Sequence, residues 1–153
     1  MSYDARLQEL GLVLPEVSPP LASYVPVMVA GDMAFVSGQL PFIDGKLVTG
    51  TLGKDVELDL AIAAARACGL MVLAQLRAAL GSLDRVSHVV KLGGFVASTP
   101  DFTDQHRVAN GASDLMAEVF GDAGRHARAA VGVPSLPLGA AVEVDAVIAL
   151  KAS

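Results

Sequence analysis

Two periodicities alternate in the hydrophobic pattern of this chain. From Asp55 to Leu80, apolar and small residues recur at three- and four-residue steps, at Leu58, Ile62, Ala65, Gly69, Val72 and Leu76. This spacing predicts a helix with one apolar face, and Gly81, which follows it, is a common helix end. A second long helix is predicted from residue 101 or 102 to residue 120, and a short one over residues 4–10.

Between these segments, apolar residues alternate with a period of two, which is typical of strands. The predicted strands are residues 24–30, 33–37, 86–97, 125–131 and 140–150. The turn signal Asp44-Gly45 lies in residues 42–48, which fit either a small accessory hairpin or a loop. The adjacent glycines Gly93 and Gly94 indicate a bulge or close packing inside a strand.

The order of these elements is two strands, a helix, a strand, a helix and two strands. It predicts an α+β fold in which both long helices cover the same face of one sheet. A length of 153 residues is typical of a single domain, here residues 1–153. Residues 1–17, with the short helix, form an N-terminal extension of that domain.

The composition predicts an oligomer. Hydrophobic residues make up 53% of the chain and charged residues 18%, whereas about a quarter of the residues are charged in an ordinary soluble domain. A chain of this size has limited interior in which to place them. In the last strand, one face is entirely apolar. The opposite face carries Glu143 and Asp145 together with Ala141, Val147 and Ala149. That second face is too apolar for water, so we expect another subunit to cover it.

Charge and cysteine content exclude several classes of function. The net charge is −5 and the 11 Lys and Arg residues are scattered, which argues against a nucleic-acid partner. The single cysteine, Cys68, excludes an intramolecular disulfide and a multi-cysteine metal site, and it is expected to be a small buried side chain. His88, His106 and His126 lack metal-ligand spacing, so no metal is expected.

Targeting signals are not evident in the sequence. The first ten residues, MSYDARLQEL, have no apolar signal core. Polar residues interrupt the longest apolar region, residues 58–83, so that no membrane association is predicted. The expected location is the cytoplasm.

Arg128 and Glu143 are the candidate functional residues, because each is a charged side chain in an otherwise apolar predicted strand. Charged groups are rarely buried unless they are paired or bound to something. A guanidinium group matches a carboxylate, and a partly dry carboxylate is a candidate acid or base. The alternatives are that Arg128 forms a structural ion pair with Glu143 or Asp145, and that Glu143 is an interfacial carboxylate.

Three segments resemble the reactive-intermediate deaminase family, also called Rid or YjgF. They are 24-YVPVMVAGDMAFVSGQLP-41, 82-SLDRVSHVVKLGGFVASTPDF-102 and 128-RAAVGVPSLPLGAAVEVDA-146. In the third and most specific segment, Arg128, Leu136-Pro137 and Glu143 hold the family spacing. The resemblance covers roughly residues 18–150.

The resemblance implies a chorismate-mutase-like fold assembled as a homotrimer, with ligand clefts between subunits. It also implies hydrolysis of enamines or imines such as 2-aminoacrylate to 2-keto acids and ammonia, without metal or cofactor. By position, Arg128 is similar to the residue that binds the substrate carboxylate, and Glu143 to the one that orients water. Tyr24 and Gly38 are similar to residues of the cleft, and Ala130 stands where some members have cysteine.

Two departures, His126 where proline is frequent and the long N-terminal extension, indicate a divergent subgroup. Whether Asp145 or His126 takes part in the site stays open. Tyr24 also fits a hydrogen-bonded aromatic residue of the core or hairpin, and Gly38 a strand end. Two alternative functions are a trimer that only binds a small carboxylate, as a metabolite sensor, and an endoribonuclease, against which the acidic charge argues.

Overall fold

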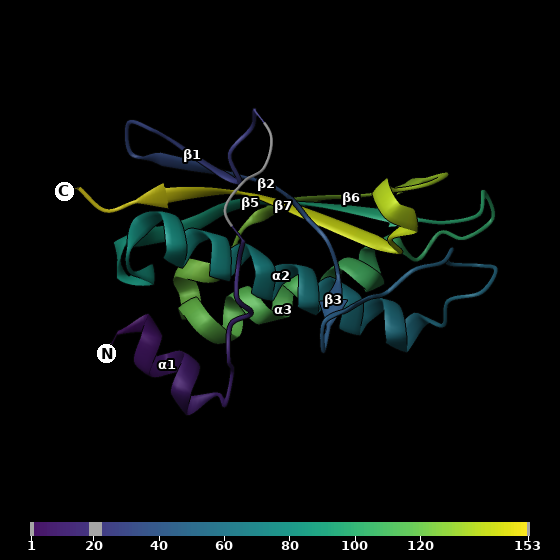
Figure 1. Ribbon diagram of the computed structural model, residues 1–153, viewed down its shortest axis with the longest axis horizontal. Helices are drawn as coiled ribbons and strands as arrows, with labels where there is room; N and C mark the ends of the chain where they lie inside the picture. Colours follow the sequence, from purple (N-terminus) through teal and green to yellow (C-terminus); the bar gives the residue numbers. More distant parts are fainter. Residues whose placement is uncertain (1, 19–22, 153) are drawn as a thin grey trace.

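The protein has two layers, a twisted sheet and a pair of long helices. The computed structural model describes residues 2–18 and 23–152, so residues 1, 19–22 and 153 of the expected domain lie outside the described residues. The helices α2 (Leu58–Leu80) and α3 (Gln105–Phe120) lie side by side against one face of the sheet (Figure 1). The predicted α+β arrangement, with both long helices on one face, is confirmed.

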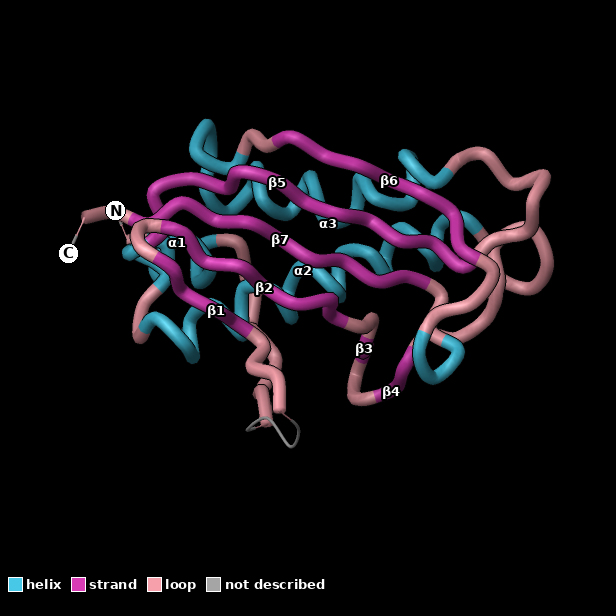
Figure 2. The backbone as a smooth tube through the Cα atoms, turned by 90° about the horizontal axis from the view of Figure 1, so that it is seen from above, coloured by secondary structure: helices cyan, strands magenta, loops and turns pink. Residues whose placement is uncertain are grey.

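The sheet, in the described part of the chain, has five strands in the order β1-β2-β7-β5-β6 (Figure 2). Their bounds are β1 Val27–Ala30, β2 Met33–Gln39, β5 Val86–Ala97, β6 Ala127–Val133 and β7 Val142–Leu150. The last strand, β7, is antiparallel to both of its neighbours, β2 and β5, while β5 and β6 are parallel. The helix α3 connects the parallel pair, which needs a crossover of this length.

The helices begin later than the hydrophobic pattern predicts, because the residues before them make turns. Asp55 accepts a hydrogen bond from the backbone N–H of Thr51 at 2.7 Å, so α2 starts at Leu58 rather than at Asp55. Thr99 Oγ1 donates to Asp101 Oδ1 at 2.6 Å, and α3 starts only at Gln105. The predicted end of α2 is confirmed, with Gly81 in the left-handed conformation at φ 83°.

Strand ends also shift by a few residues. The strand β1 begins at Val27, which leaves Tyr24 outside it, and β6 runs two residues later than the predicted 125–131 at each end. Residues 42–48 form a hairpin, β3 (Phe42–Ile43) and β4 (Lys46–Leu47), rather than a loop. The two central residues of its turn, Asp44 and Gly45, have φ values of 51° and 77°. Two positive φ angles are the mark of the tight turn that suits a hairpin.

The glycine pair in β5 serves close packing. The register of β5 with β7 is continuous from Lys91 through both glycines, and its irregularities lie earlier, between Val86 and Lys91. A Cβ on Gly93 would collide with the carboxyl group of Asp145, and one on Gly94 would lie 3.1 Å from Ala109 of α3. Of the two predicted explanations, close packing is therefore the correct one.

The N-terminal helix α1 (Tyr3–Glu9) docks near the C-terminal end of α3. The Tyr3 and Phe120 rings meet edge to face, with centroids 4.7 Å apart. Arg6 Nε donates to the backbone carbonyl of Glu118 at 2.9 Å, and the Tyr3 N–H donates to Asp84 Oδ1 at 2.8 Å. These contacts hold α1 against residues that lie 81 and 112 positions further along the sequence.

The helix α2 is the only helix in the described residues that is long and apolar enough to cross a membrane. It packs against the sheet and against its neighbour α3, and half of its most apolar window is buried, as in the core helix of a globular fold. Cys68 lies in this buried part, as expected, and burial raises the pKa of its thiol far above the ordinary range, with the charge of Glu143 adding to the effect.

The crossing of α2 and α3 depends on glycine. A Cβ on Gly111 of α3 would collide with the backbone carbonyl of Ile62 in α2. At Gly69 of α2, an added Cβ would lie 2.9 Å from the end of the flexible Leu115 side chain. The backbone at Gly111 cannot yield without moving a whole helix, whereas Leu115 can change its rotamer.

We therefore predict that Gly111→Ala lowers the free energy of unfolding by at least about 2 kcal/mol, while Gly69→Ala changes it by less than about 1 kcal/mol. Both substitutions gain the same helix propensity, so their difference isolates the steric effect. Urea unfolding followed by circular dichroism measures both. Equal stabilities of the two variants would contradict this account of the helix crossing.

Candidate functional site

Arg128 lies on the edge strand β6 and points to the helix-bearing face of the sheet. The register places it beside Leu92 of β5, which is buried against the helices. Its guanidinium group reaches α3, where Nη1 donates to Asn110 Oδ1 at 2.8 Å and to Ser113 Oγ at 3.0 Å. Nη2 donates to the backbone carbonyl of His106 at 3.2 Å.

All three partners of Arg128 are neutral oxygen atoms. Within residues 2–18 and 23–152, no ion pair between Arg128 and a carboxylate occurs. The structural ion pair with Glu143 or Asp145 is therefore wrong for this chain. Neutral partners hold the guanidinium in place without cancelling its charge, so the charge stays available to an anion from outside the chain.

Glu143 lies on the opposite face of the sheet. In β7 it pairs with Phe95 of β5, and the residues on either side of it along β7 are buried against the helices. Its carboxyl group lies so close to Gly38 that a Cβ on Gly38 would collide with Oε2. Partial burial and, secondly, the negative charge of Asp145 raise the pKa of Glu143. A carboxyl group with a raised pKa is suited to exchange a proton nearer neutral pH.

Asp145 shares this face, two positions further along β7. Burial raises its pKa as well, although the Gly93 backbone and the positive charge of Lys91 act in the opposite direction. The two carboxyl groups therefore form an acidic pair on the open face of the sheet. Asp145 is not a structural partner of Arg128, which lies on the other face.

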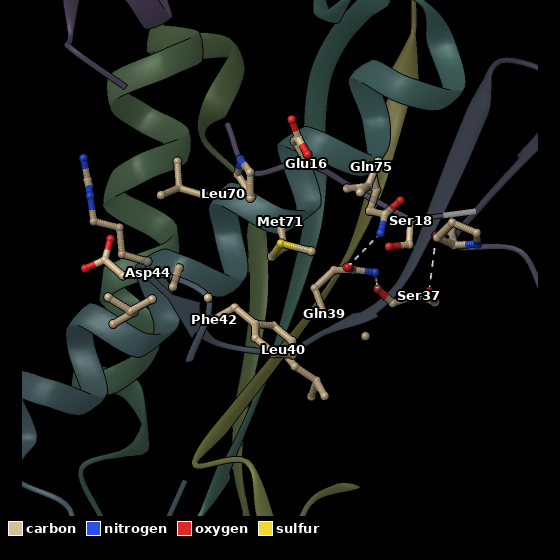
Figure 3. Close-up of a pocket in the computed structure, with 18 of the residues that line it drawn as sticks. Glu16, Ser18, Ser37, Gln39, Leu40, Phe42, Asp44, Leu70, Met71 and Gln75 are labelled. Atoms are coloured by element: carbon tan, nitrogen blue, oxygen red, sulfur yellow. Dashed lines mark hydrogen bonds between the residues drawn. The ribbon is translucent and has the colours of Figure 1, made fainter. Parts of the chain in front are cut away.

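Tyr24 and Gly38 both line a cavity of about 1030 Å³. Four parts of the chain form its walls: the segment from Val13 to Ser18, Tyr24 with Pro26, the segment from the end of β2 into the β3–β4 hairpin turn, and one side of α2 (Figure 3). Tyr24 is 65% exposed, which excludes the alternative that it is a core aromatic residue. The structure thus brings Tyr24 and Gly38 to one place, with Glu143 against Gly38.

The cavity has a polar strip in an otherwise mostly apolar lining. Gln39 is 7% exposed, and its Oε1 accepts from Gln75 Nε2 at 3.3 Å. Gln39 Nε2 donates to the Ser37 carbonyl at 3.1 Å, and Ser37 Oγ donates to the Pro26 carbonyl at 3.3 Å (Figure 3). These bonds give both the oxygen and the nitrogen of the buried Gln39 amide a partner, and they fix the end of β2 beside Gly38.

Arg128 and Glu143 do not meet within one chain. Their strands are separated by β5, which places the two backbones about 10 Å apart, and the side chains point to opposite faces. Ala130 lies two residues beyond Arg128 on the same side of β6, near Gly94 of β5. The expected site residues therefore form two groups: Arg128 with Ala130 at one edge of the sheet, and Tyr24, Gly38 and Glu143 nearer the other.

Asn110 and Ser113 bind Arg128 and were not predicted from the sequence, which left open only whether His126 takes part. The signal that could have found the first two is their spacing with His106, at steps of four and three residues, which places all three on one face of α3. His126 Nε2 lies 2.9 Å from Ser113 Oγ, so His126 takes part in this group. The His106 ring is exposed, as expected, and only its backbone carbonyl binds Arg128.

Known proteins resemble this chain over nearly its whole length. Residues 4–150 match the family described as "YjgF/chorismate_mutase-like, putative endoribonuclease". The chain belongs to the YjgF family, also called the Rid family. The chorismate-mutase-like fold that the sequence resemblance implies is thereby confirmed. Membership of the YjgF family supports a role in small-molecule binding or in deaminase-type chemistry.

Individual YjgF-family relatives agree with this assignment. Protein TCP17 of Trypanosoma cruzi is 55% identical over 149 residues, which are 96% of this chain and 93% of that protein. The crystal structure of Atu1372, a protein of unknown function from Agrobacterium tumefaciens, is 50% identical with a TM-score of 0.90, over 98% of this chain and 94% of that one. A structure from Shewanella oneidensis, titled a "putative endoribonuclease", is 36% identical with a TM-score of 0.92, over 98% and 100%.

The raised pKa of Glu143 predicts a pH-dependent effect of Glu143→Gln on stability. Because the pKa is higher in the folded state, the charged carboxylate lowers stability as pH rises through that pKa. We expect Glu143→Gln to raise Tm at pH 7 and to lose this advantage at about pH 4, where the carboxyl group is largely protonated in both states. Thermal unfolding at both pH values measures the effect.

The control is Asp114→Asn, which neutralises an exposed carboxylate on α3 and should leave Tm nearly unchanged at both pH values. A Tm gain of the same size at pH 4 and pH 7 for Glu143→Gln would mean that packing, rather than charge, causes it.

Proposed function

We propose that this protein hydrolyses reactive enamines and imines of the 2-aminoacrylate type to 2-keto acids and ammonia. The observation that carries the proposal is the state of Arg128, a guanidinium group held by three neutral oxygens with no carboxylate partner in the described residues. A fixed, uncompensated guanidinium is the group that a small carboxylate substrate requires.

We propose that Glu143 binds and orients the water molecule that attacks the imine. In the reaction, water adds to the carbon of the C=N bond and the nitrogen takes up protons. The C–N bond then breaks, leaving a carbonyl group and ammonia. One carboxyl group that binds water and exchanges a proton is sufficient help, and the raised pKa of Glu143 suits that role. Such imines are already unstable in water, so the proposed site needs neither metal nor cofactor.

The site is proposed to form between two copies of the chain. Arg128 lies at one edge of the sheet and on one face, whereas Glu143 lies on the other face, against Gly38. A substrate of a few ångströms in length cannot bridge these positions within one chain. In a ring such as the expected homotrimer, Arg128 and Ala130 of one subunit would meet Tyr24, Gly38 and Glu143 of the next.

The open face of the sheet supports this assembly. It carries exposed apolar side chains, among them Met28 at 57% and Phe35 at 46% exposure. Together with the acidic pair, these residues form a surface that a second copy would cover. The cytoplasm, where amino-acid metabolism generates such imines, is the proposed location.

Binding without turnover is the competing function. A carboxylate-binding trimer would keep Arg128 but would not need the raised pKa of Glu143, which favours the enzyme. The word endoribonuclease in the family description carries no similar support here. The chain has a net charge of −5, and RNA binding depends on clustered positive charge.

Arg128→Ala is predicted to lower kcat/KM for imine hydrolysis by about 10²-fold or more, because the substrate loses its charge-assisted hydrogen bonds. An amino-acid oxidase generates 2-iminobutanoate in the assay, and formation of the keto acid is measured against a semicarbazide trap. Arg128→Lys should recover only part of the loss, since an ammonium group cannot form the two parallel hydrogen bonds that a guanidinium group forms with a carboxylate. The matched control is Arg125→Ala, three residues away and exposed, which should behave as wild type.

A failure of wild-type protein to accelerate hydrolysis of any imino acid tried would refute the enzyme. Binding of the corresponding keto acid by that inactive protein would support the carboxylate-binding alternative.

Mixing two inactive variants tests the shared site. We expect Glu143→Gln to lower kcat by about 10²-fold or more. When Arg128→Ala and Glu143→Gln chains are mixed, unfolded and refolded together in equal amounts, about a quarter of wild-type activity should return. In a ring, about a quarter of the contacts then pair an intact Arg128 with an intact Glu143. The control is each variant refolded alone. No recovery in refolded mixtures of confirmed mixed composition would place both residues in the same subunit's site.

A further inference from the structure

We infer that Ser113 and His126 are positioning residues for Arg128, which together fix the guanidinium group in the orientation that receives a carboxylate. The inference rests on the proposed function and deepens it, because it names the residues that set affinity at the Arg128 end of the site. Neither residue touches the reacting atoms in this scheme, and both act through Arg128.

Some of the N–H donors of Arg128 bind protein atoms, and the others, in the part of the chain that the structure describes, are free to bind a ligand. A guanidinium group has five N–H donors. Both donors of Nη1 are used, one by Asn110 Oδ1 at 2.8 Å and one by Ser113 Oγ at 3.0 Å, and one donor of Nη2 is used by the His106 carbonyl at 3.2 Å. Among the described residues, Nε–H and the second Nη2–H have no partner. Nε and Nη2 form one edge of the planar guanidinium group, and along such an edge a carboxylate can be held by two parallel bonds.

The bonds of His126 have a definite direction. Its Nδ1 lies 2.6 Å from the Gly124 carbonyl, and a carbonyl oxygen can only accept, so Nδ1 carries the proton. In the neutral ring Nε2 is then an acceptor, and it lies 2.9 Å from Ser113 Oγ. Ser113 therefore donates its single proton to His126 and turns its lone pairs toward Arg128. The chain of bonds runs from Arg128 to Ser113, to His126 and to Gly124.

The far end of this chain is rigid. A Cβ on Gly124 would collide with the backbone carbonyl of Met116, so the Gly124 backbone lies in direct contact with the last turn of α3. The acceptor for His126 thus lies in the short 3-10 turn Gly121–Gly124 that follows α3, and it packs against the helix that carries Ser113. Because Ser113 lies on α3 and Gly124 packs against the same helix, Arg128 keeps its orientation relative to α3 rather than sampling the rotamers of an exposed arginine.

The test uses pyruvate, a small 2-keto acid, as the binding probe and 2-iminobutanoate as the substrate. Ser113→Ala removes the hydroxyl acceptor, and we expect the Kd for pyruvate and the KM for the imine to rise about tenfold, with kcat within twofold of wild type. Calorimetry and steady-state kinetics on the intact protein measure both. His126→Leu should act in the same direction, while His126→Gln, which keeps an acceptor near the Nε2 position, should recover part of the affinity.

The matched control is Ser98→Ala, the residue directly after β5. Ser98 Oγ donates to the Val96 carbonyl at 3.1 Å and accepts from Gln105 Nε2 at 3.4 Å, so its loss removes structural bonds between β5 and α3 without touching Arg128. Its Kd and KM should stay at wild-type values even if its Tm falls. A merely structural role for Ser113 would give the same pattern as this control.

A double-mutant cycle decides whether Ser113 acts through Arg128. In an Arg128→Ala background, Ser113→Ala should produce no further change in the Kd for pyruvate. Wild-type affinity for pyruvate in both Ser113→Ala and His126→Leu would overturn the inference while leaving the proposed function intact. If wild-type protein itself neither binds pyruvate nor accelerates imine hydrolysis, the proposed function fails, and the inference fails with it.

Discussion

The pairing of β7 with β2 on one side and with β5 on the other fixes where each candidate residue lies. β7 is the last strand made, yet it occupies the centre of the sheet and joins the first hairpin to the second half of the chain. Its strict alternation buries Val142, Val144 and Ala146 under the helices and leaves Glu143 and Asp145 on the open face. A register shift of one residue would reverse both faces, so the position of the carboxyl groups and the integrity of the core depend on the same hydrogen bonds.

The charged groups of the chain are handled differently on the two faces. On the helix side, Arg128 is held by neutral oxygens, so that its positive charge is placed but not cancelled. On the open side, Glu143 and Asp145 share a partly dry surface and their pKa values rise together with burial. The carboxylates on the open face cost stability in the free chain at neutral pH, because burial disfavours their charged form. Sites for small charged ligands commonly carry such a cost.

Much of the fold could be predicted from the sequence, because hydrophobic period and turn residues are local properties. The helix positions, the end of α2 at Gly81 and the strand pattern of β7 follow from them directly. The helix starts were placed too early because side chains such as Asp55 and Thr99 close turns with neighbours, and a period of apolar residues does not report on such bonds.

The site was predicted less completely, for physical reasons. The sequence motif singles out Arg128 and Glu143, but their assignment to opposite faces depends on how β6 and β7 are each paired with β5, and this register is a long-range property. The contact between Ser113 and His126 could not be predicted from sequence spacing, since it forms only when α3 packs beside the start of β6. The motif identifies single residues, whereas tertiary packing decides which of them meet.

The docking of α1 has a consequence for the order in which the chain is made. Arg6 binds the carbonyl of Glu118, which lies 112 positions further along, and the N–H of Tyr3 binds Asp84, 81 positions further along. A ribosome completes α1 first, but the surface that receives it does not exist until α3 has been synthesised. During most of translation, therefore, Leu7, which is 2% exposed in the finished fold, has no partner to cover it.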